Sequence, residues 1–123
     1  MTEPLGLAQV EAKILELTDL LERCTHAQRE RWEAEAAADA KYDIAFAQAF
    51  LQAKEGALPG QEKPDSDMTA KQRATVVTAT LLSERNSAHA LLESAREAAR
   101  NYRAAMDGLR SINSNVRSLT VAT

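Results

Sequence analysis

Three residues near the N-terminus have the types and spacing of a metal site. Glu22, His26 and Glu30 are four residues apart, which places them on one face of a helix. Carboxylate oxygens and imidazole nitrogens are ligands that zinc accepts. The same spacing is also that of ordinary ion pairs on a helix surface, and we prefer that interpretation. We therefore expect no metal site here.

Motifs of catalysis are missing from the sequence. It contains no phosphate-binding loop and no CxxC, HExxH or GxSxG motif, and its two histidines, His26 and His89, are far apart. Asp65 and Asp67 lack the remaining positions of a calcium loop. We expect a protein that is not an enzyme and that has no cofactor and no small-molecule substrate.

A stripe of arginines repeats along the C-terminal part of the chain. Its members, together with a neighbour on the same side of the helix, are Arg96, Arg100, Arg103, Arg110 and Arg117. Such a stripe could face an anionic partner. The alternative is a solvated helix face, which is the usual role of a charged column on a helix.

These arginines must be positioned by a long helix with a repeat of seven residues. Alternating steps of three and four residues from Ala74 to Leu119 meet apolar side chains at every position except Glu84. The positions are Ala74, Val77, Leu81, Glu84, Ala88, Leu91, Ala95, Ala98, Tyr102, Ala105, Leu109, Ile112, Val116 and Leu119. This repeat predicts a helix that packs along a partner helix as in a coiled coil.

The rest of the chain predicts a second long helical region and one break. The segment of about 5–55 is helix-favouring, as one helix or two, and Gly56 should end it. Two prolines and two glycines predict a flexible loop over 56–68. Thr69 and Gln72 match a capping box at the start of a helix over 69–119. We predict an all-α single domain, a long antiparallel helical hairpin with an additional N-terminal helix, coiled-coil-like packing and an oligomeric state. The N-terminal helix could pack within its own chain or against another subunit.

The composition supports self-association in a reducing compartment. The chain has 123 residues with only 4% aromatics, too little bulk for a large core, so copies of the chain should complete it. The residues that we expect to mediate oligomerisation are Leu7, Val10, Ile14, Leu17, Leu21, Leu109, Ile112, Val116 and Leu119. The single cysteine, Cys24, excludes an internal disulfide. Without an apolar run of membrane-spanning length or a secretion signal, we expect a cytoplasmic protein and no membrane partner.

Charge is divided unevenly along the chain. The net charge is −3, but residues 1–67 hold 7 Lys/Arg and 14 Asp/Glu, whereas residues 68–123 hold 8 and 4. Opposite charges favour antiparallel or intersubunit pairing of the two halves.

An aromatic row lies in the first helical region. Tyr42, Phe46 and Phe50 are spaced by four residues, with core packing as the expected role and stacking on nucleobases as the alternative.

The order of these segments resembles a family of small phage proteins. An Ala-rich helix ends in AFLQAKEG, a polar loop follows, and the last helix finishes in YRAAMDGLRSINSNVRSL. From about Glu33 to Leu119 this layout is similar to the UvsY-type recombination mediators. The resemblance implies a ring-shaped homo-oligomer that binds single-stranded DNA, contacts a single-strand-binding protein and helps to load a RecA-like recombinase in homologous recombination and repair. A phage origin would place it in the host cell cytoplasm.

The residues that would bind DNA differ from the family pattern. A member of the family carries a basic cluster shortly before the glycine that ends its first long helix, whereas this sequence has no base there until Lys54. We therefore expect the DNA site among Lys54, Lys63, Lys71 and Arg73, with the arginine stripe as the second choice.

A different class of function also fits the sequence. A non-enzymatic coiled-coil scaffold or chaperone-like assembly protein, which binds only protein, would show the same helices and the same repeat. The two hypotheses differ in nucleic-acid binding, which the mediator has and the scaffold lacks.

Overall fold

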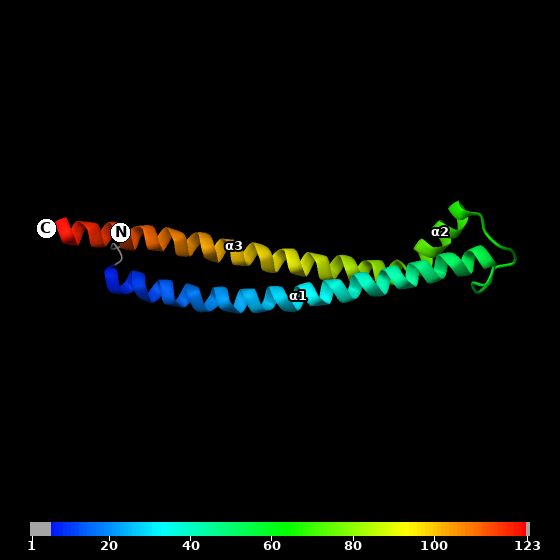
Figure 1. The fold of residues 1–123 in the computed structure, drawn as a ribbon, viewed down its shortest axis with the longest axis horizontal. Coiled ribbons are helices and arrows are strands. Elements are labelled where there is room, and N and C mark those ends of the chain that lie inside the picture. The colour runs from blue at the N-terminus through cyan, green and yellow to red at the C-terminus, as the bar shows by residue number, and fades with distance from the viewer. Residues whose placement is uncertain (1–5, 123) are drawn as a thin grey trace. The chain divides into compact units, whose positions relative to one another are not determined.

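The computed structural model describes residues 6–122, with the side chains of all of these except 116 and 118–122. Three helices follow one another: α1 (Leu7–Glu55), α2 (Asp67–Val77) and α3 (Ala79–Ala122) (Figure 1). No strand occurs in this part of the chain. None of the three helices has a stretch that is both long and apolar enough to cross a membrane. The all-α prediction is confirmed, and two long helices pack together.

The packing falls into two units. The terminal unit combines Met1–Glu30 with Glu93–Thr123, and the loop unit is Arg31–Leu92. In the terminal unit, Glu11 contacts Arg117 and Thr18 contacts Met106, so the residue numbers rise along α1 as they fall along α3. In the loop unit, Glu35 contacts His89 and Asp39 contacts Arg85, with the same reversal. α1 and α3 are therefore antiparallel within each unit.

The predicted additional N-terminal helix is not a separate element. α1 runs without interruption from Leu7 to Glu55, because the polar stretch in its middle contains no glycine or proline to break it. Val10 is fully buried and Leu17 is 7% exposed, within the terminal unit that also holds the end of α3. The N-terminal segment thus packs within its own chain.

The buried side of α3 consists of two columns of side chains, which we call its seam. One column is the predicted one, and the other is shifted by one residue from the prediction. The column of Leu81, Ala88, Ala95, Tyr102 and Leu109 is half-buried, as predicted. The second column was predicted at Val77, Glu84, Leu91, Ala98, Ala105 and Ile112. In the structure it consists of Thr78, Arg85, Leu92, Ala99 and Met106.

Burial and pairing explain this second column. Leu92 is 2% exposed and Leu91 is 47% exposed, so adjacent leucines lie on different faces. Arg85 can enter the seam because its guanidinium lies 4.7 Å from the centre of the Tyr42 ring and its Nε lies 3.6 Å from an Asp39 oxygen. A cation over an aromatic face and beside a carboxylate is stabilised where an isolated cation would not be.

Gly56 ends α1 as predicted. Its φ of 76° is in the left-handed region, which glycine adopts without a steric penalty. The Gly56 amide donates to the Ala53 carbonyl at 3.2 Å, and the Ala57 amide donates to the Gln52 carbonyl at 2.8 Å. This pair of bonds is the Schellman motif, and it satisfies two carbonyls at the end of the helix.

The predicted helix over 69–119 is two helices that begin earlier and end later. The N-cap is Ser66 and not Thr69, because the Ser66 side chain accepts a hydrogen bond from the Thr69 amide. Thr78 separates α2 from α3, and its hydroxyl donates to the Ala74 carbonyl at 2.7 Å. The Thr78 backbone has φ −101° and ψ 12°, outside the values of a regular helix, and this local change of the backbone divides α2 from α3.

Candidate nucleic-acid interface

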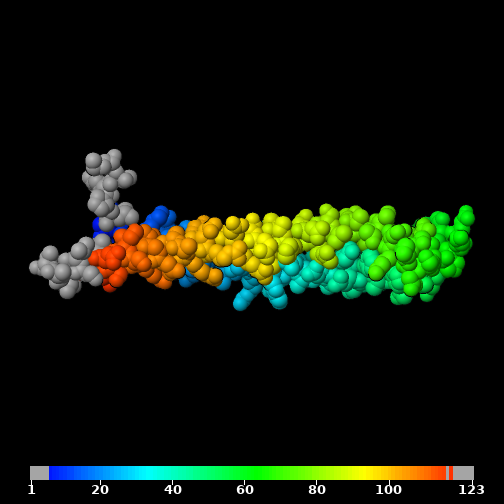
Figure 2. Space-filling model, turned by 90° about the horizontal axis from the view of Figure 1, so that it is seen from above, coloured from blue at the N-terminus to red at the C-terminus, as the bar shows by residue number. Residues whose placement is uncertain are grey.

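The four bases of the predicted loop site belong to three segments of the loop unit. Lys54 is in the last turn of α1, Lys63 is in the loop, and Lys71 and Arg73 are on α2. A small apolar cluster joins these segments: Ala53, Leu58 and Ala70 are buried together, and Phe50 packs against them. Figure 2 shows the side chains of this region as a continuous packed mass at its green end. The structure thus gathers bases that are up to 19 positions apart in the sequence.

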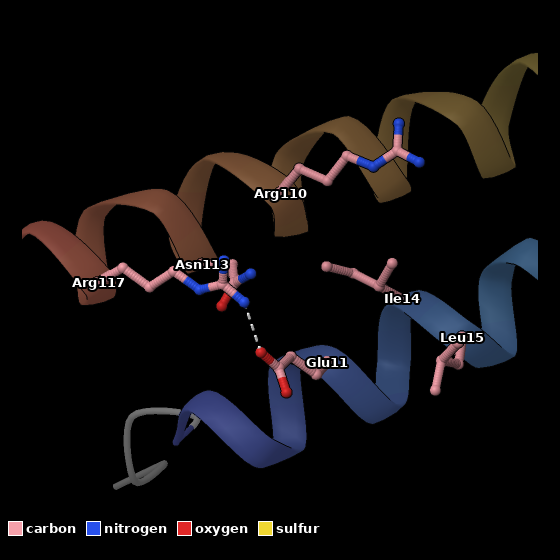
Figure 3. A pocket seen from close by; sticks show the side chains of 6 residues that line it. All are labelled: Glu11, Ile14, Leu15, Arg110, Asn113 and Arg117. Carbon is pink, nitrogen blue, oxygen red and sulfur yellow. Dashed lines mark hydrogen bonds and ion pairs between the residues drawn. The ribbon is translucent and has the colours of Figure 1, made fainter.

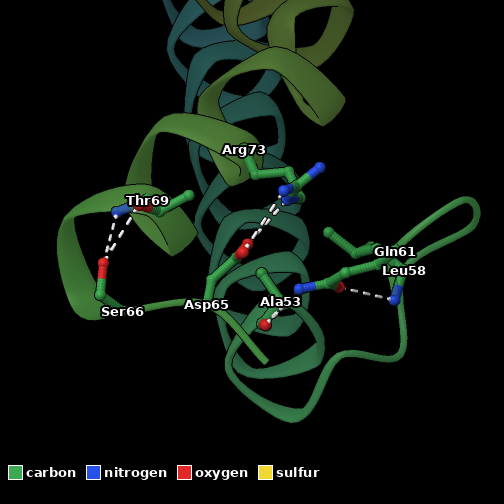
Figure 4. A network of polar contacts seen from close by, with 7 residues as sticks. All are labelled: Ala53, Leu58, Gln61, Asp65, Ser66, Thr69 and Arg73. Atoms are coloured by element: carbon green, nitrogen blue, oxygen red, sulfur yellow. Dashed lines mark hydrogen bonds and ion pairs between the residues drawn. The ribbon is translucent and has the colours of Figure 1, made fainter. Parts of the chain in front are cut away.

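Hydrogen bonds fix the loop against the end of α1. The Ala53 carbonyl accepts from the Asp65 amide at 3.0 Å and from Gln61 Nε2 at 2.6 Å (Figure 4). Gln61 also accepts from the Leu58 amide, at 3.1 Å through Oε1. The loop therefore has a defined path although it has no regular secondary structure.

Asp65 holds Arg73 in place. Arg73 Nε donates to one Asp65 oxygen at 2.7 Å, and Nη2 donates to the other at 3.3 Å. The Asp65 side chain is only 5% exposed, whereas that of Arg73 is 43% exposed. The hydrogen bond from Arg73 lowers the pKa of Asp65, and the pairing raises the pKa of Arg73. A two-point pair of this kind is among the stronger charge-assisted contacts.

Asp67 neutralises Lys54 in a more exposed place. Lys54 Nζ donates to Asp67 Oδ1, and this hydrogen bond is the main reason why the pKa of Asp67 is lowered. The Asp67 side chain is 81% exposed, so water can replace the lysine as its partner. Lys54 and Arg73 are therefore both engaged by carboxylates of their own chain, but only the Lys54 pair is open to exchange.

Lys63 and Lys71 remain for an external anion. Both are exposed, and neither forms an ion pair within 4.0 Å of a carboxylate in the part of the chain that the structure describes. Of the predicted loop site, these two lysines are the residues best placed to meet a phosphate.

The arginine stripe lies in the terminal unit and is largely paired. Arg96 contacts Glu93 at 2.8 Å, Arg110 approaches Asp107 at 3.9 Å, and Arg117 reaches across to Glu11 on α1 at 2.8 Å (Figure 3). Arg100 and Arg103 are exposed and make no ion pair among the described residues. The stripe thus offers two unengaged cations in place of five.

The predicted oligomerisation residues differ in how far they are buried. Val10 and Leu17 are buried within the terminal unit, so Val10 has no surface to offer a second chain. Leu7 and Ile112 are exposed, and Ile14, Leu21 and Leu109 are half-buried. The side chains of Val116 and Leu119 lie outside the described residues.

Some of these residues line an apolar groove of about 620 Å³. The residues that line it are Gln9, Lys13, Leu17, Ala105, Gly108, Leu109 and Ile112. Three of the predicted oligomerisation residues are among them.

Two of the three candidate metal residues, His26 and Glu30, contact each other. His26 Nε2 lies 3.2 Å from Glu30 Oε1, and both side chains are well exposed. Within residues 6–122, no three His, Cys, Asp or Glu side chains come together as metal ligands would. The His26–Glu30 contact is one that a spacing of four residues places on the surface of a helix.

Sequence reasoning missed the two aspartates that decide the charge of the site. Asp65 and Asp67 were considered only as calcium ligands, and their partners lie 8 and 13 positions away. No helical or strand periodicity connects such positions, because the loop between them sets the geometry. The signal available in the sequence was the equal mixture of acids and bases around the loop.

Comparisons of the chain with protein-family models, with curated proteins and with solved structures found no match.

Proposed function

We propose that the protein is an oligomeric recombination mediator that binds single-stranded DNA and helps to load a RecA-like recombinase. The observation that carries the proposal is that Lys54, Lys63, Lys71 and Arg73 come from three segments of the loop unit that one small apolar cluster holds together. Lys63 and Lys71 present exposed ammonium groups there. Phosphates are the natural partners of such groups.

The proposal requires oligomerisation, because a single subunit would bind DNA too weakly. Two free lysines per subunit release few counterions and would bind DNA only weakly. A ring that repeats the pair along one strand would add these contacts together. The groove lined by Leu17, Leu109 and Ile112 gives the chain an apolar surface that another subunit could cover.

The protein partners follow from the resemblance of the layout to UvsY-type mediators. A recombinase and a single-strand-binding protein are the partners that the proposal names, and the cytoplasm of a host cell is where they would meet. The acidic residues of 1–67 are available for contacts with basic surfaces of such proteins.

One observation favours the alternative of a protein-binding scaffold. Lys54, Arg73, Arg96 and Arg117 already have carboxylate partners at 2.8 Å or closer, as an ordinary helical scaffold would arrange them. A scaffold would use the exposed apolar residues and would leave DNA unbound.

Fluorescence anisotropy separates the two functions. Labelled single- and double-stranded oligonucleotides are titrated with the protein at low and at moderate salt. The mediator should prefer the single strand and should lose affinity as salt rises. Absence of binding at low salt, where screening is weakest, would reject the mediator and leave the scaffold.

A matched pair of variants locates the site. Lys63→Glu with Lys71→Glu reverses the charge of the two lysines that form no ion pair among the described residues, and keeps Lys54 and Arg73 themselves unchanged. Arg31→Glu with Lys41→Glu makes the same change of charge at exposed positions of α1 in the same unit. We expect the first variant to lose at least about tenfold in affinity and the second to lose much less. Equal losses would mean that net charge, and not this site, governs binding.

A further inference from the structure

A groove beside the four bases combines an aromatic ring with a free lysine. It has a volume of about 390 Å³ and is lined by Phe50, Asp67, Met68 and Lys71. Phe50 comes from α1 and the other three come from the first turns of α2. The groove belongs entirely to the loop unit.

The Phe50 ring is held on one side and accessible on the other. It packs against the buried cluster of Ala53, Leu58 and Ala70, so its position is set before any ligand arrives. It also lines the groove, where Met68 is 73% exposed. An exposed methionine next to an aromatic ring is a polarisable apolar surface, which a flat ring can contact with little reorganisation.

We propose that this groove binds one nucleobase of single-stranded DNA, stacked on Phe50 and covered by Met68, with the adjoining phosphate at Lys71. This inference rests on the proposed function and names the contact that would make the site prefer a single strand. A base in a duplex is already stacked on both faces and cannot enter a groove, whereas an unpaired base can. Every base has such a face, so the contact tolerates any sequence.

The lysines around the groove attract a phosphate, whereas the carboxylate of Asp67 opposes its binding. Lys71 lines the groove, and Lys54 donates a hydrogen bond to Asp67, another lining residue. Asp67 is 81% exposed, so its carboxylate can turn to water while a phosphate takes Lys54. Arg73 remains paired with the nearly buried Asp65, so it holds the loop in place and does not bind phosphate. Asp67 therefore competes with DNA for Lys54, and removal of its charge should tighten binding.

The test uses the whole chain and an oligonucleotide that contains one 2-aminopurine, whose fluorescence falls when it stacks. Phe50→Leu keeps apolar contact with the core but removes the ring. Met68→Ala shortens an exposed side chain. The control is Leu51→Ala, which removes a similar apolar surface from the next residue of α1, where 60% of it is exposed.

The four variants at and near the groove each have an expected result. Phe50→Leu should bind the single strand about 5- to 100-fold more weakly, with less quenching and with the same dependence on salt, because stacking and not phosphate contact is lost. Lys71→Glu should instead reduce the salt dependence by about one counterion. Asp67→Asn should bind about 3- to 10-fold more tightly, and Leu51→Ala should bind as the unchanged protein does.

Each outcome bears on a different statement. If the unchanged protein binds DNA but Phe50→Leu and Met68→Ala bind equally well and quench equally, the groove is not a base site, and the mediator proposal stands without it. If the unchanged protein binds no oligonucleotide, the mediator proposal itself fails. Should Phe50→Leu lose its helical circular dichroism, the affinity of Met68→Ala decides: weaker binding supports the base site and unchanged binding rejects it.

Discussion

Asp65 accepts hydrogen bonds from both Nε and Nη2 of Arg73, at 2.7 and 3.3 Å, and this pair joins the loop to α2. The carboxylate is almost shielded from water, and its backbone amide is bonded to the Ala53 carbonyl at the end of α1. One residue therefore connects three segments: α1, the loop and α2.

The first prediction concerns the stability of the fold at low pH. The pKa values of Asp65 and Asp67 are lowered in the folded protein from the ordinary value of 3.8, mainly by hydrogen bonds from Arg73 and Lys54. The folded state therefore holds these protons less tightly than the unfolded state does. The stabilisation is complete above the unfolded pKa and is lost as pH falls through the lower, folded pKa.

We expect the melting temperature to fall between about pH 5 and pH 2, and to fall less in the Asp65→Asn, Asp67→Asn double variant. Thermal denaturation followed by circular dichroism at several pH values measures both. Equal acid sensitivity of the two proteins would show that other carboxylates are responsible.

The second prediction compares two glycines with the same backbone conformation. Gly56 has φ 76° and Gly60 has φ 79°. Alanine at position 60 meets no atom within 4 Å and should cost about 1–2 kcal/mol from its conformation alone. At position 56, the added methyl group would also lie 3.0 Å from the Pro64 nitrogen and 3.1 Å from the Lys63 carbonyl carbon. Urea denaturation should show a clearly larger loss for Gly56→Ala, and equal losses would contradict the close approach of the loop.

The third prediction tests the position of the α3 seam with neighbouring leucines. Leu92→Ala should lower the free energy of unfolding by about 2–5 kcal/mol, because the side chain is almost completely buried. Leu91→Ala should lower it by less than about 1 kcal/mol. If chemical denaturation showed a larger loss for Leu91→Ala than for Leu92→Ala, the column predicted from the sequence would be the buried one.

The fourth prediction concerns the start of α2. Ser66→Ala should cost about 1 kcal/mol, since the Ser66 hydroxyl accepts from the Thr69 amide at 3.4 Å. Thr69→Val keeps the shape of the side chain and should cost less, because the Thr69 hydroxyl only receives a hydrogen bond from Ser66. Denaturation midpoints of the two variants distinguish them, and a larger loss for Thr69→Val would make Thr69 the cap.

Local chemistry in the sequence determined where helices form and where α1 ends. Gly56 is the only glycine between Gly6 and the loop, and the prolines after it cannot continue a helix, so no tertiary contact was needed to predict that end. The column of Leu81, Ala88 and Ala95 followed in the same way from its repeat of seven. The N-cap predicted at Thr69 was wrong, because Ser66 has a capping side chain too and the path of the loop places Ser66 at the start of α2.

Tertiary structure decided which face of α3 is inside and which bases are free. Two columns one residue apart are both acceptable by apolar content, and the choice depends on α1, where Asp39 and Tyr42 receive Arg85. The engagement of Lys54 and Arg73 depends likewise on a loop that folds Asp65 and Asp67 back onto them. A sequence displays charge and periodicity residue by residue, but the partner of a charged side chain is set by contacts that only folding brings within reach.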